Sequence, residues 1–228
     1  MLKSLVHIMR TPTTLAVILL LFFTSCSVST TSLNDIVSGI KSGQAIIQYQ
    51  DGKYSEAMTT RQAFEKLKSN EKMYLSSGRV ELTEPLEISG LENIEIIGNK
   101  TSFVAKIDMP VITFKKTKNT SLYDLFVVHE IGEWCAQNCV EFYNASDIDV
   151  KKCIFDGSGY FGLALTNVNS ALIEDNQFFN CEYGLAAWKS TNLTVKNNAF
   201  NKNRADDIMV NDEEQFSNDF RKENTFKE

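Results

Sequence analysis

The stretch from Asn192 to Asn203, NLTVKNNAFNKN, repeats the pattern of two earlier segments, SALIEDNQFFNC from Ser170 and DIDVKKCIFDGS from Asp147. Its apolar members recur at steps of 23 and then 22 residues, as Val150, Ile173 and Val195 and as Phe155, Phe178 and Phe200. A period of 20-odd residues with short strands in each unit is typical of solenoids, whose units bury one another's apolar faces. The repeat therefore predicts that like residues stack on successive turns.

Two further series have the same period. The first is apolar and contains Val140, Leu163, Leu185 and Ile208. The second contains Cys153, Asn176 and Asn198, and we expect it to mark a bend, because asparagine tolerates a left-handed backbone and its amide can bond to the next turn. In the same register Lys151, Glu174 and Lys196 form an outward column of alternating charge, which favours this alignment.

The earlier turns are less regular. Ile96 and Leu122 extend the valine and isoleucine column, at wider steps that require inserted loops. The largest predicted insertion runs from His129 to Cys139. A capping box at Thr59 and Gln62 predicts a short helix before the first turn.

Phrases such as LTVKNNAF and GLAL, after an amphipathic helix and the line MYLSSGRVELTEPLEISGLENIEIIGN, resemble the pectin-lyase-like superfamily. The resemblance covers about residues 59–211 and implies an all-β fold, a right-handed parallel β-helix of about five to six coils with an N-terminal capping helix. It implies no single activity, because this fold carries lyases, hydrolases, epimerases and non-catalytic proteins.

The N-terminus predicts export. Lys3 and Arg10 accompany an apolar run, Leu15 to Phe23, that is shorter than the roughly 20 residues a membrane-spanning helix needs. The segment LLLFFTSCS resembles the lipobox of bacterial lipoproteins, which implies a signal peptide at 1–25 and lipidation (palmitate) of Cys26. An ordinary secretory signal with an incidental Cys26 is the alternative. The lipobox implies an envelope protein held on a lipid bilayer, with a lean towards the periplasm.

Composition sets further limits. A formal net charge of −6 argues against nucleic acid as a partner. Serine and threonine dominate the start of 26–45, which we expect to be a tether, and 46–228 would be the β-helix domain. Export permits disulfides, but the connectivity of the remaining cysteines stays open: Cys135, Cys139, Cys153 and Cys181.

Enzyme chemistry has sparse signals. Beyond the leader the only histidine is His129, so a Cys–His pair would have to use it, and structural cysteines are the simpler interpretation. Asp147 and Asp149 supply too few carboxylates for the calcium ion of the family's lyases, and no metal or cofactor is predicted. Asp206 and Asp207, with Glu182 one coil earlier, resemble the aspartates of polygalacturonases, although that family's Gly-His-Gly and Arg-Ile-Lys motifs are missing.

A binding face is better marked. If Val140, Phe142 and their equivalents point inward, alternation turns a column of Tyr143, Thr166, Trp188 and Asn211 outward, beside Glu141, Ala164, Ala186 and Met209. Small alanines between aromatic residues would leave a trough, and aromatic faces commonly hold sugars. The alternative is that Trp188 packs under a neighbouring loop.

The sequence thus predicts non-catalytic recognition of a carbohydrate or another envelope component, through Glu141, Tyr143, Thr166, Trp188 and Asn211. Two alternatives remain. One is a small polysaccharide lyase or glycoside hydrolase that uses Asp206, Asp207 and Glu182. The other is a structural or assembly lipoprotein without a ligand.

Overall fold

The computed structural model describes residues 33–131, 135–211 and 215–227. All of the described fold lies in one compact unit, within residues 32–228. The predicted signal peptide and Cys26 lie outside the described residues. Within those residues no helix is long and apolar enough to cross a membrane.

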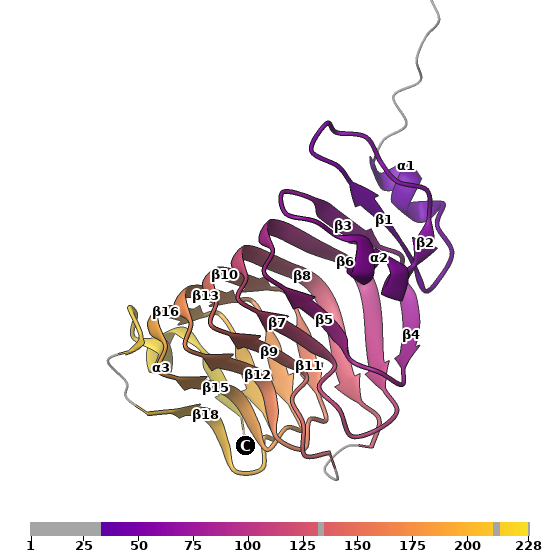
Figure 1. Cartoon of the computed structure of the whole chain (residues 1–228). Coiled ribbons are helices and arrows are strands. Elements are labelled where there is room, and N and C mark those ends of the chain that lie inside the picture. The colour runs from indigo at the N-terminus through magenta and orange to yellow at the C-terminus, as the bar shows by residue number, and fades with distance from the viewer. Residues whose placement is uncertain (1–32, 132–134, 212–214, 228) are drawn as a thin grey trace, which may run out of the picture. The chain divides into compact units, whose positions relative to one another are not determined.

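The fold is all-β and consists of two sheets, which we call sheet A and sheet B (Figure 1). Sheet A has 13 strands. They are β1 (Gln44–Gln48), β2 (Met58–Thr59), β3 (Lys72–Leu75), β4 (Gly78–Leu82), β6 (Glu92–Ala105), β8 (Lys118–His129), β10 (Ser146–Lys151), β11 (Ile154–Asp156), β13 (Asn169–Glu174), β14 (Gln177–Phe179), β16 (Thr191–Lys196), β17 (Ala199–Asn201) and β19 (Thr225–Lys227). Sheet B has six, namely β5 (Leu86–Ser89), β7 (Ile112–Lys115), β9 (Val140–Tyr143), β12 (Phe161–Thr166), β15 (Tyr183–Trp188) and β18 (Asp206–Val210).

The chain passes alternately through sheet A and sheet B, and successive turns pair in parallel. The result is the predicted right-handed parallel β-helix, with about seven turns. It exceeds the five to six expected because turns form at both ends of the regular repeat, at β3 to β5 and at β19. Among the strands that the structure describes, only β1 pairs antiparallel, with β2 and β3, at the N-terminal end.

The predicted columns are confirmed by the strand register. Val150 pairs with Ile173, Ile173 pairs with Val195, and Leu122 and Ile96 continue the column towards the N-terminus. The rings of Phe155, Phe178 and Phe200 stack at centroid distances of 4.9 and 4.8 Å. Phe226 adds a further ring at 5.2 Å. A second stack joins Phe114 and Phe142 at 4.5 Å on the sheet B side. Apolar side chains of both sheets therefore fill one continuous core between the sheets.

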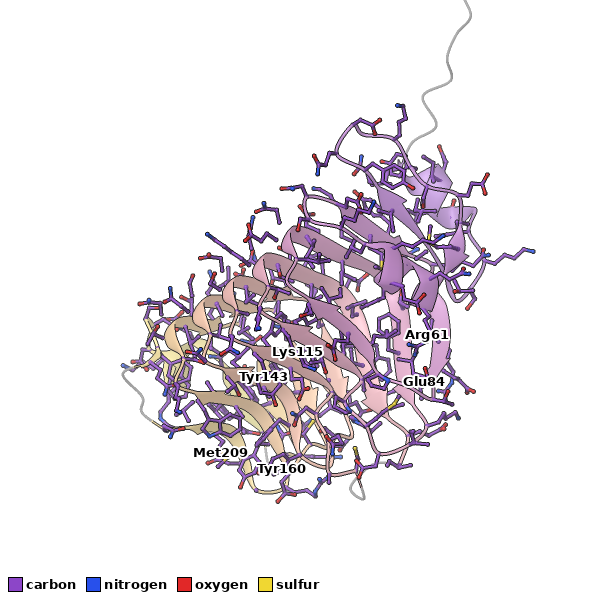
Figure 2. The ribbon with its side chains drawn as sticks, in the orientation of Figure 1. Arg61, Glu84, Lys115, Tyr143, Tyr160 and Met209 are labelled. Atoms are coloured by element: carbon purple, nitrogen blue, oxygen red, sulfur yellow. The ribbon has the colours of Figure 1, made fainter. Side chains whose placement is uncertain are left out.

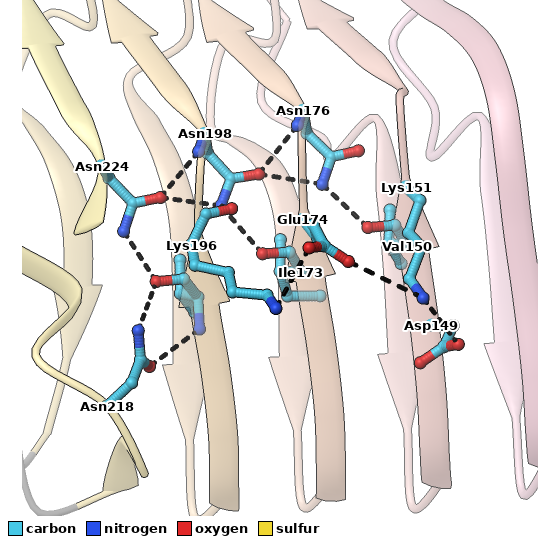
Figure 3. Close-up of polar contacts among 11 residues, drawn as sticks. Asp149, Val150, Lys151, Ile173, Glu174, Asn176, Lys196, Asn198, Asn218 and Asn224 are labelled. Carbon is cyan, nitrogen blue, oxygen red and sulfur yellow. Dashed lines mark hydrogen bonds and ion pairs between the residues drawn. The ribbon is translucent and has the colours of Figure 1, made fainter.

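The bends are built differently from the prediction in one respect. The left-handed residue is not Asn176 or Asn198 but the residue before each member of that series: Lys152, Asp175 and Asn197, with φ of 54°, 58° and 57°. The buried amides instead form a ladder, in which Asn198 Oδ1 accepts from the backbone N and Nδ2 of Asn176 at 2.9 and 3.0 Å (Figure 3). Asn224 repeats this contact on Asn198. The ladder satisfies backbone groups that the bend removes from the sheets.

The charged column is also as predicted. Glu174 lies between Lys196 at 3.1 Å and Lys151 at 3.8 Å, and Lys151 also contacts Asp149 at 3.3 Å (Figure 3). These groups are partly exposed, so each pair contributes modestly to stability.

The N-terminal cap contains α1 (Leu33–Ser38) and α2 (Thr60–Lys66). The Thr59 side chain accepts from Gln62 N, and the Gln62 side chain accepts from Thr59 N, which confirms the capping box. Phe64 is buried and meets Phe103 edge-on at 6.1 Å, so α2 covers the first turns. Within the stretch 26–45 expected to be a tether, residues 33–38 are helical and β1 begins at Gln44.

The C-terminal end is closed in part by α3 (Phe220–Glu223). Phe220 is buried and packs against Phe216 at 4.2 Å between ring centroids.

Candidate functional site

The outward face of sheet B carries the predicted binding column. Thr166 pairs with Tyr143 on one side and with Trp188 on the other, so the three residues lie on successive turns. Ala164 is likewise flanked by Glu141 and Ala186, and Ala186 by Met209. Asn211 follows β18 beyond its last paired residue and is exposed. Figure 2 labels Lys115, Tyr143, Tyr160 and Met209 on this face.

An aromatic cluster lies on this face, outside the main core. Its buried members are Phe161, Ala164 and Ala186, and the partly exposed Tyr183, Trp188 and Met209 pack against them. The Phe161 ring lies 4.8 Å from that of Trp188 and 5.5 Å from that of Tyr183. Tyr160, 43% exposed, stands 3.9 Å from Phe161. Trp188 is therefore packed on one side by the strand face itself, and its partly exposed surface belongs to a platform of several rings.

Sequence alternation did not identify Phe161, Tyr183 and Tyr160 as members of this platform. The alternation that turns Leu163 and Leu165 inward would also turn Phe161 inward. Phe161 instead packs in the outer cluster. The residue after it, Gly162, is tightly enclosed, since a Cβ there would lie 2.7 Å from the carbonyl oxygen of Gly184. A Cβ on Gly184 would lie 2.8 Å from the Phe200 ring. The two glycines let the strand starts approach the phenylalanine stack closely, and their 22-residue spacing was the available signal.

Glu141 is the most enclosed charged group of the face, with 7% of its surface exposed. Its carboxylate accepts hydrogen bonds from Thr113 Oγ1 and Asn138 Nδ2, each at 2.8 Å. The Tyr143 hydroxyl stands 3.5 Å away, and burial together with the Glu141 charge raises the pKa of Tyr143. Lys115, the register partner of Tyr143, binds Glu87 at 2.7 Å. The face is thus polar over β5 to β9 and aromatic over β12 to β18.

The predicted catalytic carboxylates separate into two environments. Asp206 and Asp207 border a hollow of about 320 Å³ together with Lys202, Asn203, Phe226 and Lys227. Asn203 Nδ2 donates to Asp207 at 2.7 Å, and partial burial raises the pKa of Asp207. Glu182 does not line this hollow, and it forms an ion pair with Arg204 at 3.1 Å. The structure therefore joins Asp206 to Asp207 and leaves Glu182 engaged elsewhere.

The histidine and cysteines of the long insertion are buried. His129 Nε2 donates to the Met109 carbonyl at 2.7 Å, because a carbonyl oxygen can only accept, and Nδ1 then faces the Cys139 thiol at 3.6 Å. Burial lowers the pKa of His129 and raises that of Cys139, which favours neutral imidazole and thiol over a reactive ion pair. All four described cysteines are free thiols: Cys135, Cys139, Cys153 and Cys181.

Metal ligation has little support among the residues that the structure describes. No group of three or more His, Cys, Asp or Glu side chains gathers there. Asp149 is engaged with Lys151, and Asp147 occupies a left-handed bend with φ of 57°.

The fold and this face define the class of protein, a right-handed parallel β-helix with one aromatic outer wall. In agreement, the family model described as "Right handed beta helix region" matches residues 125–228. No curated protein matches the chain. Among solved structures, ORF18 of Geobacillus virus E2 is similar with a TM-score of 0.55 and 13% identity, over 66% of this chain and 36% of the viral chain.

A second solved structure is titled a "putative glycosyl hydrolase" from Parabacteroides merdae. It aligns with a TM-score of 0.44 and 8% identity, over 66% of this chain and 81% of the other. The chain spans little more than a third of the viral protein. At these identities the similarity concerns the fold alone.

Proposed function

We propose that the protein is a lipid-anchored cell-envelope protein that recognises a polysaccharide without cleaving it, through the outward face of sheet B. The observation that carries the proposal is the aromatic cluster around Phe161, which exposes part of Trp188, Tyr183 and Tyr160 beside small alanines. The opposite side of the same strands already contributes to the main core, so the fold does not need a second apolar cluster on its outside. Exposed apolar patches of this kind mark interaction sites.

The geometry suits an extended sugar chain. Tyr143 and Trp188 are two turns apart, about 10 Å along the stack. The turn between them carries Thr166 and the small Ala164, and Ala186 lies beside Trp188 on the next turn. A chain running along the stack would therefore meet a ring, a hydroxyl group and a second ring in turn. Rings with a polar edge, such as Tyr and Trp, are well suited to amphipathic ligands.

Glycan-array binding of the exported domain with and without Trp188→Ala tests this function. We expect the variant to lose most of its binding, on the order of tenfold or more, because one large ring of the platform is removed. The matched control is Tyr49→Ala, which should bind normally. Tyr49 directly follows β1 and is 41% exposed. Binding that survives Trp188→Ala unchanged would contradict the proposal.

The lipobox around Cys26 supports the lipid anchor: an acylated Cys26 would hold the protein on a membrane, with the β-helix domain facing the periplasm. Cys26→Ser should move the protein from the membrane fraction to the soluble fraction and abolish incorporation of labelled palmitate. Thr31→Ala, a nearby change outside the lipobox, should leave both unchanged. Membrane retention of Cys26→Ser would refute lipid anchoring while leaving glycan recognition open to its own test.

A second candidate is glycan cleavage at the hollow beside Asp206 and Asp207. Partial burial, which raises the pKa of Asp207, favours it, because a raised pKa is the direction of change that a carboxyl acting as a general acid needs. Release of reducing ends or unsaturated products from pectins, alginates or glycosaminoglycans would support it, provided that Asp206→Asn and Asp207→Asn abolish the release. A purely structural role is less favoured, since the charges of the Lys151, Glu174 and Lys196 column are paired with one another.

A further inference from the structure

The outward face of sheet B carries carboxylates and an amine on the strands β5 to β9. Glu87 and Glu141 are its carboxylates over β5 to β9, and Lys115 is the basic residue among them. The Lys115 amine binds Glu87 at 2.7 Å, and that hydrogen bond is the main cause of its raised pKa. Lys115 is therefore occupied within the face. Two other lysines, Lys116 and Lys189, lie at left-handed bends just beyond the strand ends.

Glu141 is the carboxylate without a basic partner. Among the described residues no Lys, Arg or His nitrogen lies within 4 Å of it, whereas Glu87 and Glu95 each have one and Glu174 has two. Its three hydrogen-bond donors, from Thr113, Asn138 and Tyr143, are all neutral. Lys115 interacts with Glu141 through space but is bonded to Glu87, so the direct hydrogen bonds to this enclosed carboxylate come from neutral groups alone. An incoming cation would reduce the cost of burying its charge.

The orientation of Glu141 favours an incoming ligand on one side. Thr113 holds Oε1 from the preceding turn, and Asn138 and Tyr143 hold Oε2 from its own turn. On the following turn its register partner is Ala164, whose side chain is a methyl group without a donor. A carboxylate offers about four acceptor positions, and three donors are present here. One acceptor position of Glu141 is therefore left without a protein donor, and the aromatic platform begins on the following turn, at Ala164.

We propose that the ligand of this face is a glycan with free amino groups, of the glucosamine type, and that Glu141 accepts one of its ammonium groups. This inference rests on the proposed glycan recognition and adds the ligand's charge. The ammonium would meet Glu141 while the neighbouring sugars lie over Ala164, Thr166 and the ring of Trp188, one to two turns away. Uronates and sulfated sugars would place like charge beside Glu141 and Glu87, and would bind less well.

The test compares three oligosaccharides of equal length by calorimetry: β-1,4-linked glucosamine, its N-acetylated form, and galacturonate. Wild-type protein should prefer the glucosamine oligomer, and Glu141→Gln should lower that affinity about tenfold or more, the usual effect of removing a charge-assisted hydrogen bond. Affinity for the N-acetylated oligomer should change less than about twofold. The matched control for the protein's overall negative charge is Glu95→Gln. Glu95 is an outward carboxylate on sheet A that binds Lys72 at 2.7 Å, and this variant should bind the oligomers like wild type.

The outcomes separate this inference from the proposed function. Preference for the N-acetylated or uronate oligomer, still sensitive to Trp188→Ala, would overturn the ammonium site and leave glycan recognition standing. An equal loss in Glu95→Gln and Glu141→Gln would likewise overturn it. Absence of binding to all three would overturn both. If Glu141→Gln does not fold, the affinity of the wild-type protein at increasing salt concentration tests the ammonium site instead. Binding of the glucosamine oligomer should weaken as salt is added, and binding of the N-acetylated oligomer should not.

Discussion

The ring of Phe161 lies 4.8 Å from the ring of Trp188 and meets it at 64°, on the outside of sheet B. Phe161 itself is 3% exposed, so it acts as the buried support of the platform and not as its surface. Such edge-to-face contacts add to the stabilisation from area burial alone. Phe161 therefore restrains the orientation of Trp188, and under the proposed function this would reduce the entropy lost when a ligand binds.

Loss of Phe161 should release Trp188. In a Trp134→Phe background, which leaves Trp188 as the single tryptophan, Phe161→Ala should shift the fluorescence emission to longer wavelength because the indole gains water. Quenching by acrylamide should rise in parallel. Tyr49→Ala in the same background should leave the spectrum unchanged, and an unshifted spectrum for Phe161→Ala would show that this ring does not cover Trp188.

The phenylalanine stack should contribute strongly to stability at its centre and weakly at its end. Phe178 is fully buried between Phe155 and Phe200, so Phe178→Ala should lower the free energy of unfolding by about 3–5 kcal/mol. Phe226 occupies the same column but is 39% exposed, and Phe226→Ala should cost about 1 kcal/mol or less. Urea denaturation of the two variants measures the difference. Equal costs would mean that the stack is not one buried column.

The asparagine ladder should depend on its central member. Asn198 is 1% exposed, and its Nδ2 also donates to the Ile173 carbonyl at 2.9 Å. Asn198→Ala leaves that carbonyl and the backbone N of Asn176 without these partners, which should cost about 3 kcal/mol of unfolding free energy. Asn211→Ala, an exposed asparagine, should change it by less than about 0.5 kcal/mol. A similar small change for Asn198→Ala would show that water replaces the ladder.

Alkaline pH should destabilise the fold through its buried thiols. Burial raises the pKa of Cys153 from 9.0 to about 12 and that of Cys135 to about 11. Below pH 9 each thiol keeps its proton in both states, so it adds no pH dependence there. Above pH 9 the unfolded chain loses the proton while the folded chain retains it, and stability falls until the pH passes the folded pKa. Each thiol contributes a slope of up to about 1.4 kcal/mol per pH unit.

Unfolding of wild type and Cys153→Ala at a series of pH values from 8 to 11 measures this effect. The variant starts less stable, but its stability should fall less steeply above pH 9, so the two curves should converge. Parallel curves across this range would contradict the burial of the Cys153 thiol.

The regular half of the fold was predictable because its chemistry repeats in sequence. The steps that align Val150 with Ile173 and Val195 are the same steps that align Phe155 with Phe178 and Phe200, so one register satisfies two columns at once. The outward positions of Tyr143, Thr166 and Trp188 follow from that register and strand alternation. Their role as ligand contacts does not follow from either and stays a prediction.

The remainder needed three-dimensional information. The left-handed position of the bend falls on Lys152 and Asp175 as well as on Asn197, so backbone geometry and not residue preference selects it there. Phe161 packs outward with Ala164 and Ala186 although it is two residues from the inward Leu163, which period-two alternation does not predict. The partners that hold Glu141 come from Thr113, a turn earlier, and from Asn138 in the irregular insertion, so spacing alone does not bring them together.

The asparagine ladder has a consequence for how such a molecule can change over evolution. Asn176, Asn198 and Asn224 present the same donor and acceptor to the turn above and below, so any two of these turns could be neighbours. If one whole repeat were gained or lost, the two turns brought together would still match each other. The rest of the chain would shift along the stack by one strand spacing, about 4.8 Å. Under the proposed function, gain or loss of a repeat would lengthen or shorten the face that contacts the polysaccharide and leave the contacts of the other turns unchanged.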